Sequence, residues 1–407
     1  MNGFRAMACA SVLAIIAPPI LAAARTLPDI WTTTWEAPMV SATPTSPGQY
    51  EGQTIRTIAH ISAGGHAIRL RISNEFGTDY LKFGEIHLAA SAGNSVILSG
   101  TDHLVTFAGR KELSVPVGAT AVSDPVSLEV PPGINLTISL YVTKTNQISD
   151  HQNSEQYSYL ANGDLTAAKA MPGSTTIYDR PFLTGIDVLG SPIAGSVVAL
   201  GDSITDGNGS DTNQNDRWPD DLAARLIAAY NNRVGVGNAG ISGNALISRP
   251  APTNPVATGR FNQDVLAQPG RCWVILLEGI NDIGNTLCCG PAPSADELIS
   301  ADRELIATAH GMGLKIFAMT LLPYQGAFYY TAAGEQKRER LNAFIRDGGE
   351  FDAVFDTDAA LRDPKNLLQL NPIYDSGDHL HPNAAGDQVI ADTVDISLFR
   401  QPPPAAR

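Results

Sequence analysis

The chain has 407 residues, more than a single domain usually has, because hydrophobic cores rarely grow beyond roughly 250 to 300 residues. Its formal net charge is −14 and it contains no run of Lys or Arg, which excludes nucleic acids and anionic membrane surfaces as expected partners. Its four cysteines are too few for a disulfide scaffold.

The first 24 residues have the pattern of a signal peptide. Arg5 is followed by an apolar run, Ala6 to Leu21, and then by the small residues Ala22 to Ala24. The run is short and contains Pro18 and Pro19, and no later segment reaches the ~20 apolar residues that a membrane span needs. We therefore expect an exported protein, secreted or periplasmic, without stable membrane insertion.

Removal of this segment takes away Cys9 and leaves Cys272, Cys288 and Cys289. Cys272 precedes an apolar run and the other two follow it, so a strand there places them near opposite ends of a sheet. A bridge between Cys288 and Cys289 and a thiol pair without function both remain open. A zinc site is disfavoured, because these thiols lack the paired Cys-x-x-Cys spacing.

Residues 25–190 are expected to form a β-domain. Apolar and polar residues alternate with period two from about residue 32 to residue 187, and the stretch 67–73 shows the pattern clearly. There the aliphatic side chains would face a core, while Arg69 and Arg71 would face outward. Such alternation is typical of strands with one buried face.

Turn residues divide this region into several short strands. Gly64-Gly65 suits a hairpin turn between two alternating runs, and Pro131-Pro132-Gly133 precedes another alternating run at 134–142. Several short strands with this spacing predict an antiparallel β-sandwich or jelly roll.

Residues 191–400 show a different pattern, in which continuous apolar segments alternate with amphipathic ones. Apolar strands separated by helices indicate a parallel sheet covered on both faces, hence a doubly wound, flavodoxin-like α/β domain. Its ligand site should lie beyond the carboxyl ends of the strands. A Pro/Ala-rich tail, 401–407, follows. The expected strands are Ser196–Leu200, Val234–Val236, Trp273–Leu277, Leu314–Met319 and Ala353–Phe355, and the expected helices are Asp220–Tyr230, Asp296–His310 and Gly334–Ile345.

Ser203 follows the first of these strands directly, in Gly201-Asp202-Ser203-Ile204-Thr205. This position is at the mouth of the sheet, where a nucleophile is accessible to substrate. A lone Gly-Asp-Ser would more simply be a helix-capping turn, in which Ser and Asp are common.

Two further polar segments follow the second and third strands. They contain Gly243 in Asn238-Ala239-Gly240-Ile241-Ser242-Gly243 and Asn281 in Gly279-Ile280-Asn281-Asp282. Acyl transfer needs hydrogen-bond donors aimed at a developing oxyanion. The backbone N–H groups of Ser203 and Gly243 and the amide of Asn281 would supply three, although Gly243 and Asn281 taken singly also suit ordinary turns.

A carboxylate and an imidazole lie three residues apart near the C-terminus, at Asp378 and His381. One turn of chain would hold the acid against the ring, and the ring would then accept the Ser203 proton. His379 forms an H-x-H pair with His381, so a metal site is the competing hypothesis. We rank it below the triad because no further Cys, His or Glu cluster completes it.

The four segments, Gly-Asp-Ser-Ile-Thr, Asn-x-Gly-x-Ser-Gly, Gly-x-Asn-Asp and Asp-x-x-His-Pro, resemble in this order the signature blocks of the SGNH (GDSL-type) hydrolase superfamily. The resemblance implies Ser203 as nucleophile, Asp378 and His381 as the other triad residues, and an oxyanion hole of Ser203, Gly243 and Asn281. It implies no cofactor and no metal. Ile204 replaces a more common Leu and keeps the apolar packing. The β-rich first half is similar to the extra domain of a bacterial subgroup of secreted GDSL esterases.

The leading hypothesis is a secreted serine esterase, a carboxylic ester hydrolase that works through an acyl-enzyme. Export and an accessory β-domain favour an acetylated carbohydrate, such as an acetylated polysaccharide, as the acyl ester substrate. A lipase or lysophospholipase is the second hypothesis, although no long apolar lid segment lies between the strands. A non-catalytic carbohydrate-binding protein is the third, and a substituted Ser, Asp or His would have indicated it.

Overall fold

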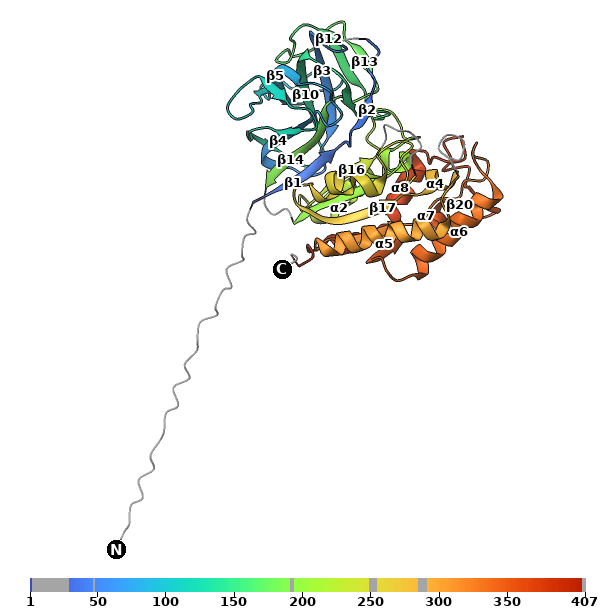
Figure 1. Ribbon diagram of the computed structural model, residues 1–407. Coiled ribbons are helices and arrows are strands. Elements are labelled where there is room, and N and C mark those ends of the chain that lie inside the picture. The colour runs from blue at the N-terminus through green and yellow to red at the C-terminus, as the bar shows by residue number, and fades with distance from the viewer. Residues whose placement is uncertain (2–28, 47, 191–193, 249–254, 285–290, 405–407) are drawn as a thin grey trace.

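The computed structural model describes residue 1 and residues 29–46, 48–190, 194–248, 255–284 and 291–404. All but the first residue of the expected signal peptide lie outside these ranges, as do Cys288 and Cys289. The described chain forms two parts that lie against each other, a β-domain coloured blue to green and an α/β domain coloured yellow to red (Figure 1).

The β-domain contains the strands up to Gly190, and almost all of them belong to two antiparallel sheets. The first sheet consists of β1 (Ile30–Glu36), β14 (Leu183–Gly190), β4 (Gly65–Ser73), β8 (Thr120–Val122) and β9 (Val126–Val130). The second consists of β13 (Thr175–Ile177), β12 (Ser158–Asn162), β3 (Gln53–His60), β10 (Asn135–Lys144), β5 (Leu81–Ala90), β6 (His103–Leu104) and β7 (Leu113–Val115). A separate pair is formed by β2 (Val40–Ala42) and β11 (Ile148–Asp150).

The two sheets enclose one hydrophobic core, as the period-two pattern predicts. Ile68, Leu70 and Ile72 of β4 are fully buried in the same cluster as Leu136 and Ile138 of β10, which belongs to the other sheet. The predicted antiparallel β-sandwich is therefore confirmed.

The predicted hairpin at Gly64-Gly65 is wrong. The strands on either side of these glycines, β3 and β4, belong to opposite sheets and do not pair. The two glycines instead allow other backbone segments to pack closely against the chain. A Cβ at Gly64 would lie 2.2 Å from the carbonyl oxygen of Val130, and a Cβ at Gly65 would lie 2.4 Å from the carbonyl oxygen of Leu189. The chain thus crosses between sheets at a point where backbone segments nearly touch.

The α/β domain has a five-stranded parallel sheet in the order β16-β15-β17-β18-β19. Its strands are β15 (Gly195–Gly201), β16 (Val234–Gly240), β17 (Arg271–Leu277), β18 (Lys315–Met319) and β19 (Ala353–Phe355), with a small pair, β20 (Arg362–Asp363) and β21 (Asn366–Leu370). Its helices are α1 (Ser203–Asp206), α2 (Trp218–Tyr230), α3 (Ala257–Phe261), α4 (Ile280–Gly284), α5 (Ala295–Gly311), α6 (Ala332–Asp347), α7 (Thr357–Leu361) and α8 (Ala384–Thr393), with a π-helical turn at Asn262–Leu266 and a 3₁₀ turn at Ile396–Phe399.

This strand order confirms the predicted doubly wound, flavodoxin-like sheet. In chain order the strands are arranged 2-1-3-4-5, so the order reverses between β15 and β17, and ligands bind at such a reversal in open α/β sheets. The helices pack in pairs, α2 with α8 and α5 with α6. None of the helices in the described ranges is both long and apolar enough to cross a bilayer.

The outer face of the first β-sheet is covered by the α/β domain, which corrects the expectation that both arginines of β4 face outward. Arg71 is only 8% exposed and lies 3.4 Å from the buried carboxylate of Asp187. On the same face the Thr33 hydroxyl lies 3.3 Å from Asp187 Oδ1 and 3.3 Å from Gln268 Oε1 of the α/β domain. Period-two alternation reveals that a face is polar, but not that a second domain covers it.

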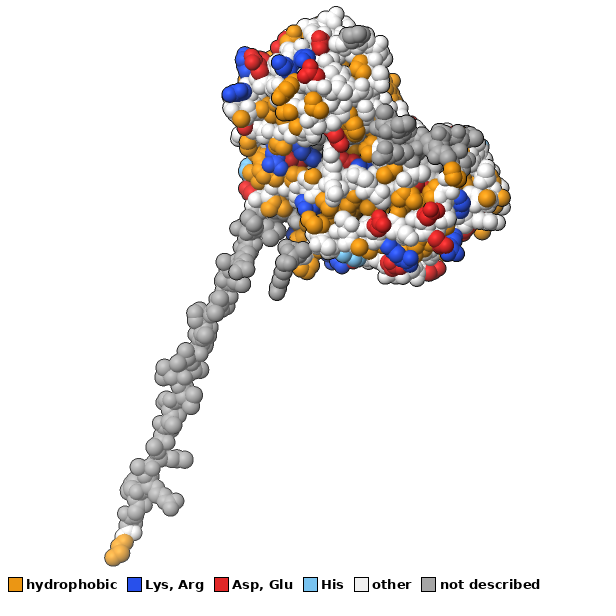
Figure 2. All heavy atoms as spheres, viewed as in Figure 1, with side chains coloured by type: hydrophobic (Ala, Val, Ile, Leu, Met, Phe, Trp, Pro, Cys, Tyr) orange, Lys and Arg blue, Asp and Glu red, His pale blue; other side chains and the backbone are white. Residues whose placement is uncertain are grey.

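The edge strand β16 of the parallel sheet is capped by the β-domain. The Ser62 hydroxyl donates to the Val236 carbonyl at 3.0 Å and accepts from the Val236 N–H at 2.7 Å. An uncovered edge strand invites pairing with other chains, so this contact protects it. On the face of the molecule that Figure 2 shows, acidic and basic side chains are mixed with each other.

Gly64→Ala should destabilise the protein by about 1–3 kcal/mol, the usual cost of forcing extra atoms into a closely packed region. The added methyl would have to displace the backbone at Val130 and Pro131. Gly311→Ala is the matched control, because nothing lies within 4 Å of a Cβ at that helical position. Urea midpoints and melting temperatures of the two variants check this, and equal values would contradict the close-approach role of Gly64.

Candidate active site

Ser203 lies in a tight turn at the end of a central strand. Strand β15 ends at Gly201, and Ser203 is the first residue of α1. The Asp202 side chain caps this short helix by accepting from the Ile204 N–H at 2.9 Å. Gly201 is required here, since a Cβ would lie 2.2 Å from Thr205 Oγ1. The turn presents the Ser203 hydroxyl beyond the carboxyl edge of the sheet.

His381 and Asp378 meet Ser203 from the loop between β21 and α8. The His381 Nε2 atom lies 2.7 Å from Ser203 Oγ, and His381 Nδ1 lies 2.5 Å from Asp378 Oδ2. The other Asp378 oxygen accepts from the backbone N–H groups of Leu380 and His381, both at 2.9 Å. The structure thus brings the three predicted triad residues into one continuous hydrogen-bonded chain.

Asp378 remains ionised because of these hydrogen bonds. Burial by itself raises the pKa of Asp378, but the His381 ring, the His381 backbone N–H and the Leu380 backbone N–H together hold this pKa well below its ordinary value. The carboxylate is therefore available to stabilise a positive charge on the His381 ring.

The two other predicted oxyanion residues lie in segments that are tied to each other. The Asn281 side-chain amide donates to the Asn244 carbonyl at 2.7 Å, next to Gly243, and its oxygen accepts from the Tyr329 hydroxyl at 3.4 Å. Gly243 has φ +75°, in the left-handed region that favours glycine. Asn281 has two amide hydrogens, so one remains for a ligand after the bond to Asn244.

His379 is directed to a different partner from His381. Its Nδ1 atom lies 2.7 Å from Asp375 Oδ2, whereas the His381 ring lies between Ser203 and Asp378. Within the described ranges, no group of three or more His, Cys, Asp or Glu side chains is arranged to hold a metal ion. The two rings of the H-x-H pair thus have different partners.

Sequence reasoning missed Arg260, which joins the strand ends around Ser203. Its buried guanidinium donates to the carbonyls of Gly201 at 2.9 Å and Ala239 at 2.8 Å, and to Asn244 Oδ1 at 2.9 Å. Asp264 balances its charge at 3.1 Å. Arg260 lies outside the four signature blocks, so nothing in the motif pattern indicated it.

The role of Asp282 was also missed, although the residue belongs to the third block. Its carboxylate accepts from the backbone N–H groups of Leu246, Ile247 and Ser248 at 2.6, 3.1 and 2.8 Å. It therefore holds the chain that follows Gly243. A signal for this role was its place directly after Asn281, at the same strand end.

Two more buried carboxyl groups lie at the strand ends. Burial raises the pKa of Asp202 and raises that of Glu278 well above its ordinary value, and the charge of Asp202 raises the Glu278 pKa further. Both groups are thereby shifted toward their neutral forms.

Comparison with known proteins identifies the domain that carries this site. Residues 199–389 match the model of the GDSL-like lipase/acylhydrolase family. This segment is a GDSL-like lipase/acylhydrolase domain. The match confirms the family that the four sequence blocks predict, and it includes Ser203, Gly243, Asn281, Asp378 and His381.

Solved structures of several hydrolases resemble about half of the chain. A GDSL-like lipase from Bacteroides thetaiotaomicron VPI-5482 is 21% identical over 50% of this chain and 88% of its own, with a TM-score of 0.39. A variant of an acetyl xylan esterase from Geobacillus stearothermophilus is 22% identical over 53% and 98%, with a TM-score of 0.38. A carbohydrate acetylesterase family member from Sinorhizobium meliloti is 15% identical over 50% and 97%, with a TM-score of 0.40. The search of curated proteins returned no match.

Arg260→Met should destabilise the protein by about 3–5 kcal/mol, because it leaves the Asp264 carboxylate and two strand-end carbonyls buried without their donor. Arg303→Met removes an exposed ion pair with Glu350 and is the matched control, with an expected cost of about 0–1 kcal/mol. The free energies of urea unfolding decide this. A loss for Arg260→Met no larger than for the control would show that the guanidinium does not hold the strand ends.

Proposed function

We propose that the protein is a serine esterase, a carboxylic ester hydrolase that works through an acyl-enzyme. The observation that carries this proposal is the hydrogen-bonded chain from Ser203 Oγ to His381 Nε2 at 2.7 Å and from His381 Nδ1 to Asp378 at 2.5 Å. A serine paired with a base, which is in turn oriented by a carboxylate, is the arrangement that activates a hydroxyl as a nucleophile.

In this mechanism Ser203 Oγ attacks the ester carbonyl carbon while His381 Nε2 takes the hydroxyl proton. Asp378 stabilises the imidazolium that forms. The tetrahedral intermediate then collapses, His381 returns the proton to the leaving alkoxide, and the alcohol departs. Water, activated by His381, attacks the acyl-serine in the same way, releases the carboxylic acid and regenerates Ser203.

The negative charge on the tetrahedral intermediate would be held by the Ser203 N–H, the Gly243 N–H and the free amide hydrogen of Asn281. The contact of Asn281 with Asn244 supports this, because it places the Asn281 amide beside the segment that contains Gly243. Donors fixed in this way need no reorganisation when the charge develops.

The substrate class we propose is an acetylated carbohydrate. The support is indirect and comes from the sequence: the signal-peptide pattern of residues 1–24 points to export, where acetylated polymers occur, and a β-domain offers a second surface for a glycan. A panel of acetylated polysaccharides and of acyl esters of graded chain length tests this class. Preference for long acyl chains would favour a lipase instead.

Ser203→Ala should leave the fold intact and lower kcat for p-nitrophenyl acetate by roughly 10³- to 10⁶-fold, since the acyl-enzyme cannot form. Ser300→Ala, on the exposed surface of α5, is the control and should keep full activity. Circular dichroism confirms folding on the same samples. Near-normal turnover by folded Ser203→Ala would remove Ser203 from the mechanism, and absence of any esterase activity in the wild type would favour a binding protein.

Asn281→Ala should lower kcat by about 10²- to 10³-fold with little change in KM, because the lost donor acts on the transition state. Asn281→Asp should be at least as damaging, since its carboxylate would repel both the oxyanion and the Asn244 carbonyl. Tyr329→Phe is the matched control, because it removes the other Asn281 contact and keeps the amide donor. We would measure kcat per titrated active site and melting temperature together; full activity per site in Asn281→Asp would exclude the oxyanion role.

A further inference from the structure

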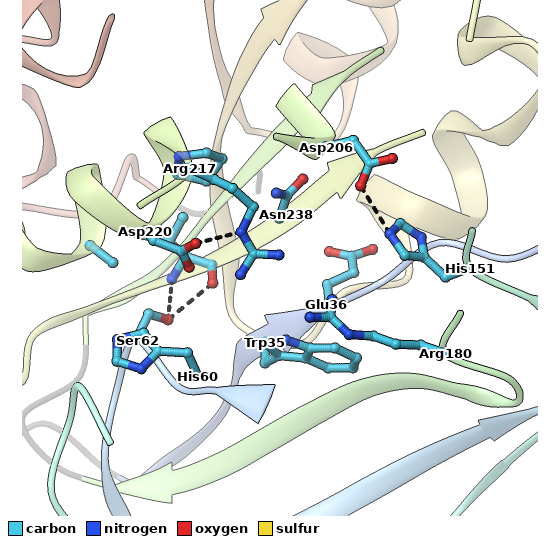
Figure 3. Close-up of a pocket in the computed structure, with 13 residues that line it drawn as sticks. Trp35, Glu36, His60, Ser62, His151, Arg180, Asp206, Arg217, Asp220 and Asn238 are labelled. Carbon is cyan, nitrogen blue, oxygen red and sulfur yellow. Dashed lines mark hydrogen bonds and ion pairs between the residues drawn. The ribbon is translucent and has the colours of Figure 1, made fainter. Parts of the chain in front are cut away.

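One histidine of the β-domain reaches into the α/β domain near the candidate site. His151 directly follows β11 and is 4% exposed. Its Nδ1 atom lies 2.9 Å from the Pro38 carbonyl oxygen of its own domain, and its Nε2 atom lies 3.0 Å from Asp206 Oδ1 of the α/β domain (Figure 3). The ring therefore bridges the two domains.

Asp206 connects this histidine to the segment of Gly243. Asp206 is the last residue of α1, the helix that begins with Ser203. Its second oxygen, Oδ2, accepts from the Ser242 backbone N–H at 2.9 Å and from the Ser242 hydroxyl at 2.7 Å. One carboxylate thus links the nucleophile helix, His151 and the residue directly before Gly243.

Both ring nitrogens of His151 have partners, one in each domain. The Pro38 carbonyl only accepts, so His151 Nδ1 donates to it. His151 Nε2 lies within hydrogen-bond distance of Asp206 Oδ1, while Asp206 Oδ2 accepts two hydrogen bonds from Ser242. The orientation of the ring is therefore fixed from both sides.

The surroundings keep this pair away from bulk solvent. Asp206 is 1% exposed. Both residues line a small polar cavity of about 20 Å³ that also contacts Glu36, Arg180 and Arg217 (Figure 3). A cavity of this size has room for about one water molecule. The link between the domains is thus held in a low-dielectric setting, where electrostatic contacts are least screened.

We propose that His151 is a positioning residue for the reaction of the α/β domain. Through Asp206 it holds Ser242 in place and, with Ser242, the neighbouring Gly243, whose N–H is one of the proposed oxyanion donors. The β-domain then contributes a residue to the active-site scaffold and is more than an attached glycan-binding module. This inference rests on the proposed esterase function.

A merely structural role makes a different prediction from a positioning role. If His151 only docks the domains, its loss lowers the melting temperature and leaves kcat per folded site unchanged. If it positions the oxyanion segment, its loss lowers kcat and leaves KM nearly unchanged, because the displaced donor acts on the transition state. The decrease in kcat must be smaller than the decrease caused by deleting an oxyanion donor itself.

The experiment compares His151→Ala and His151→Gln with His87→Ala. His87 is the matched control, because it is another largely buried histidine of the β-domain that pairs with an aspartate, Asp102, at 2.9 Å. Glutamine at 151 keeps a donor that can reach Asp206. The readouts are kcat and KM for p-nitrophenyl acetate per titrated active site, and melting temperature.

We expect His151→Ala to lower kcat about 10- to 100-fold at nearly constant KM, the effect of a misplacement of about 1 Å at the reacting centre. His151→Gln should recover part of this loss, and His87→Ala should keep the wild-type kcat. Asp206→Asn combined with His151→Ala should lower kcat by no more than the larger single change, because both act through one link.

Unchanged kcat per titrated site in folded His151→Ala would overturn the inference, as would an equal loss in His87→Ala. Should His151→Ala fail to fold, His151→Gln and Asp206→Asn still decide it by their kcat. Ser203→Ala on the same substrate separates this result from the proposed function: if Ser203→Ala keeps full turnover, the esterase mechanism fails, whereas if only the His151 variants keep it, the positioning role fails.

Discussion

The candidate site depends on one buried cation, Arg260, which holds together chain segments that the parallel sheet alone does not connect. The paired residues of β15 and β16 end at Gly201 and Gly240. One further hydrogen bond runs from the Ile241 N–H to the Gly201 carbonyl at 3.0 Å, and beyond it the chain turns away in two directions. The Arg260 guanidinium accepts neither a proton nor a hydrogen bond, and it spans the Gly201 and Ala239 carbonyls and Asn244 with fixed, planar geometry. Ser203 follows one of these segments and Gly243 belongs to the other, so Arg260 helps to fix their relative position, together with the Asp206 carboxylate that binds Ser242.

The β-domain is the second constraint on the site. Its first sheet covers the edge strand β16, whose outer backbone groups at Val236 bond to Ser62. A Cβ at Gly235 would lie 2.3 Å from the Thr33 carbonyl, so small residues on β16 are what allow β1 to approach. The two domains therefore meet backbone to backbone. A shift of the β-domain would displace β16, the strand that leads to Gly243.

Much of the fold, and the grouping of Ser203, Asp378 and His381 in one hydrogen-bonded chain, could be predicted from the sequence, because both have local signals. The parallel strands are apolar throughout, and Ser203, Asp378 and His381 lie in short motifs of fixed spacing. Arg71 and Arg260 could not be predicted, because their burial depends on segments distant in sequence: Arg71 is covered by the other domain, and Arg260 bonds to carbonyls of two separate strands. The hairpin prediction at Gly64-Gly65 was wrong for a related reason. A glycine pair indicates that the backbone lies close to other atoms, but it does not say whether the strands before and after it pair with each other.

Among the described residues, two histidine–carboxylate pairs lie at the two ends of the helix α1, and their surroundings suit them to opposite tasks. In the pair His381 and Asp378, the carboxylate side chain is about half exposed, and the ring nitrogen that faces Ser203 Oγ meets a hydroxyl that can donate or accept. This ring can gain and lose a proton without breaking its bond to Asp378. In the pair His151 and Asp206, both ring nitrogens face acceptors and both side chains are almost fully buried. A ring whose two nitrogens both face acceptors in a buried setting is suited to holding a position rather than to transferring protons. In the proposed mechanism the same two residue types would serve proton transfer at one end of α1 and fixed geometry at the other, and the difference comes from what faces the second ring nitrogen.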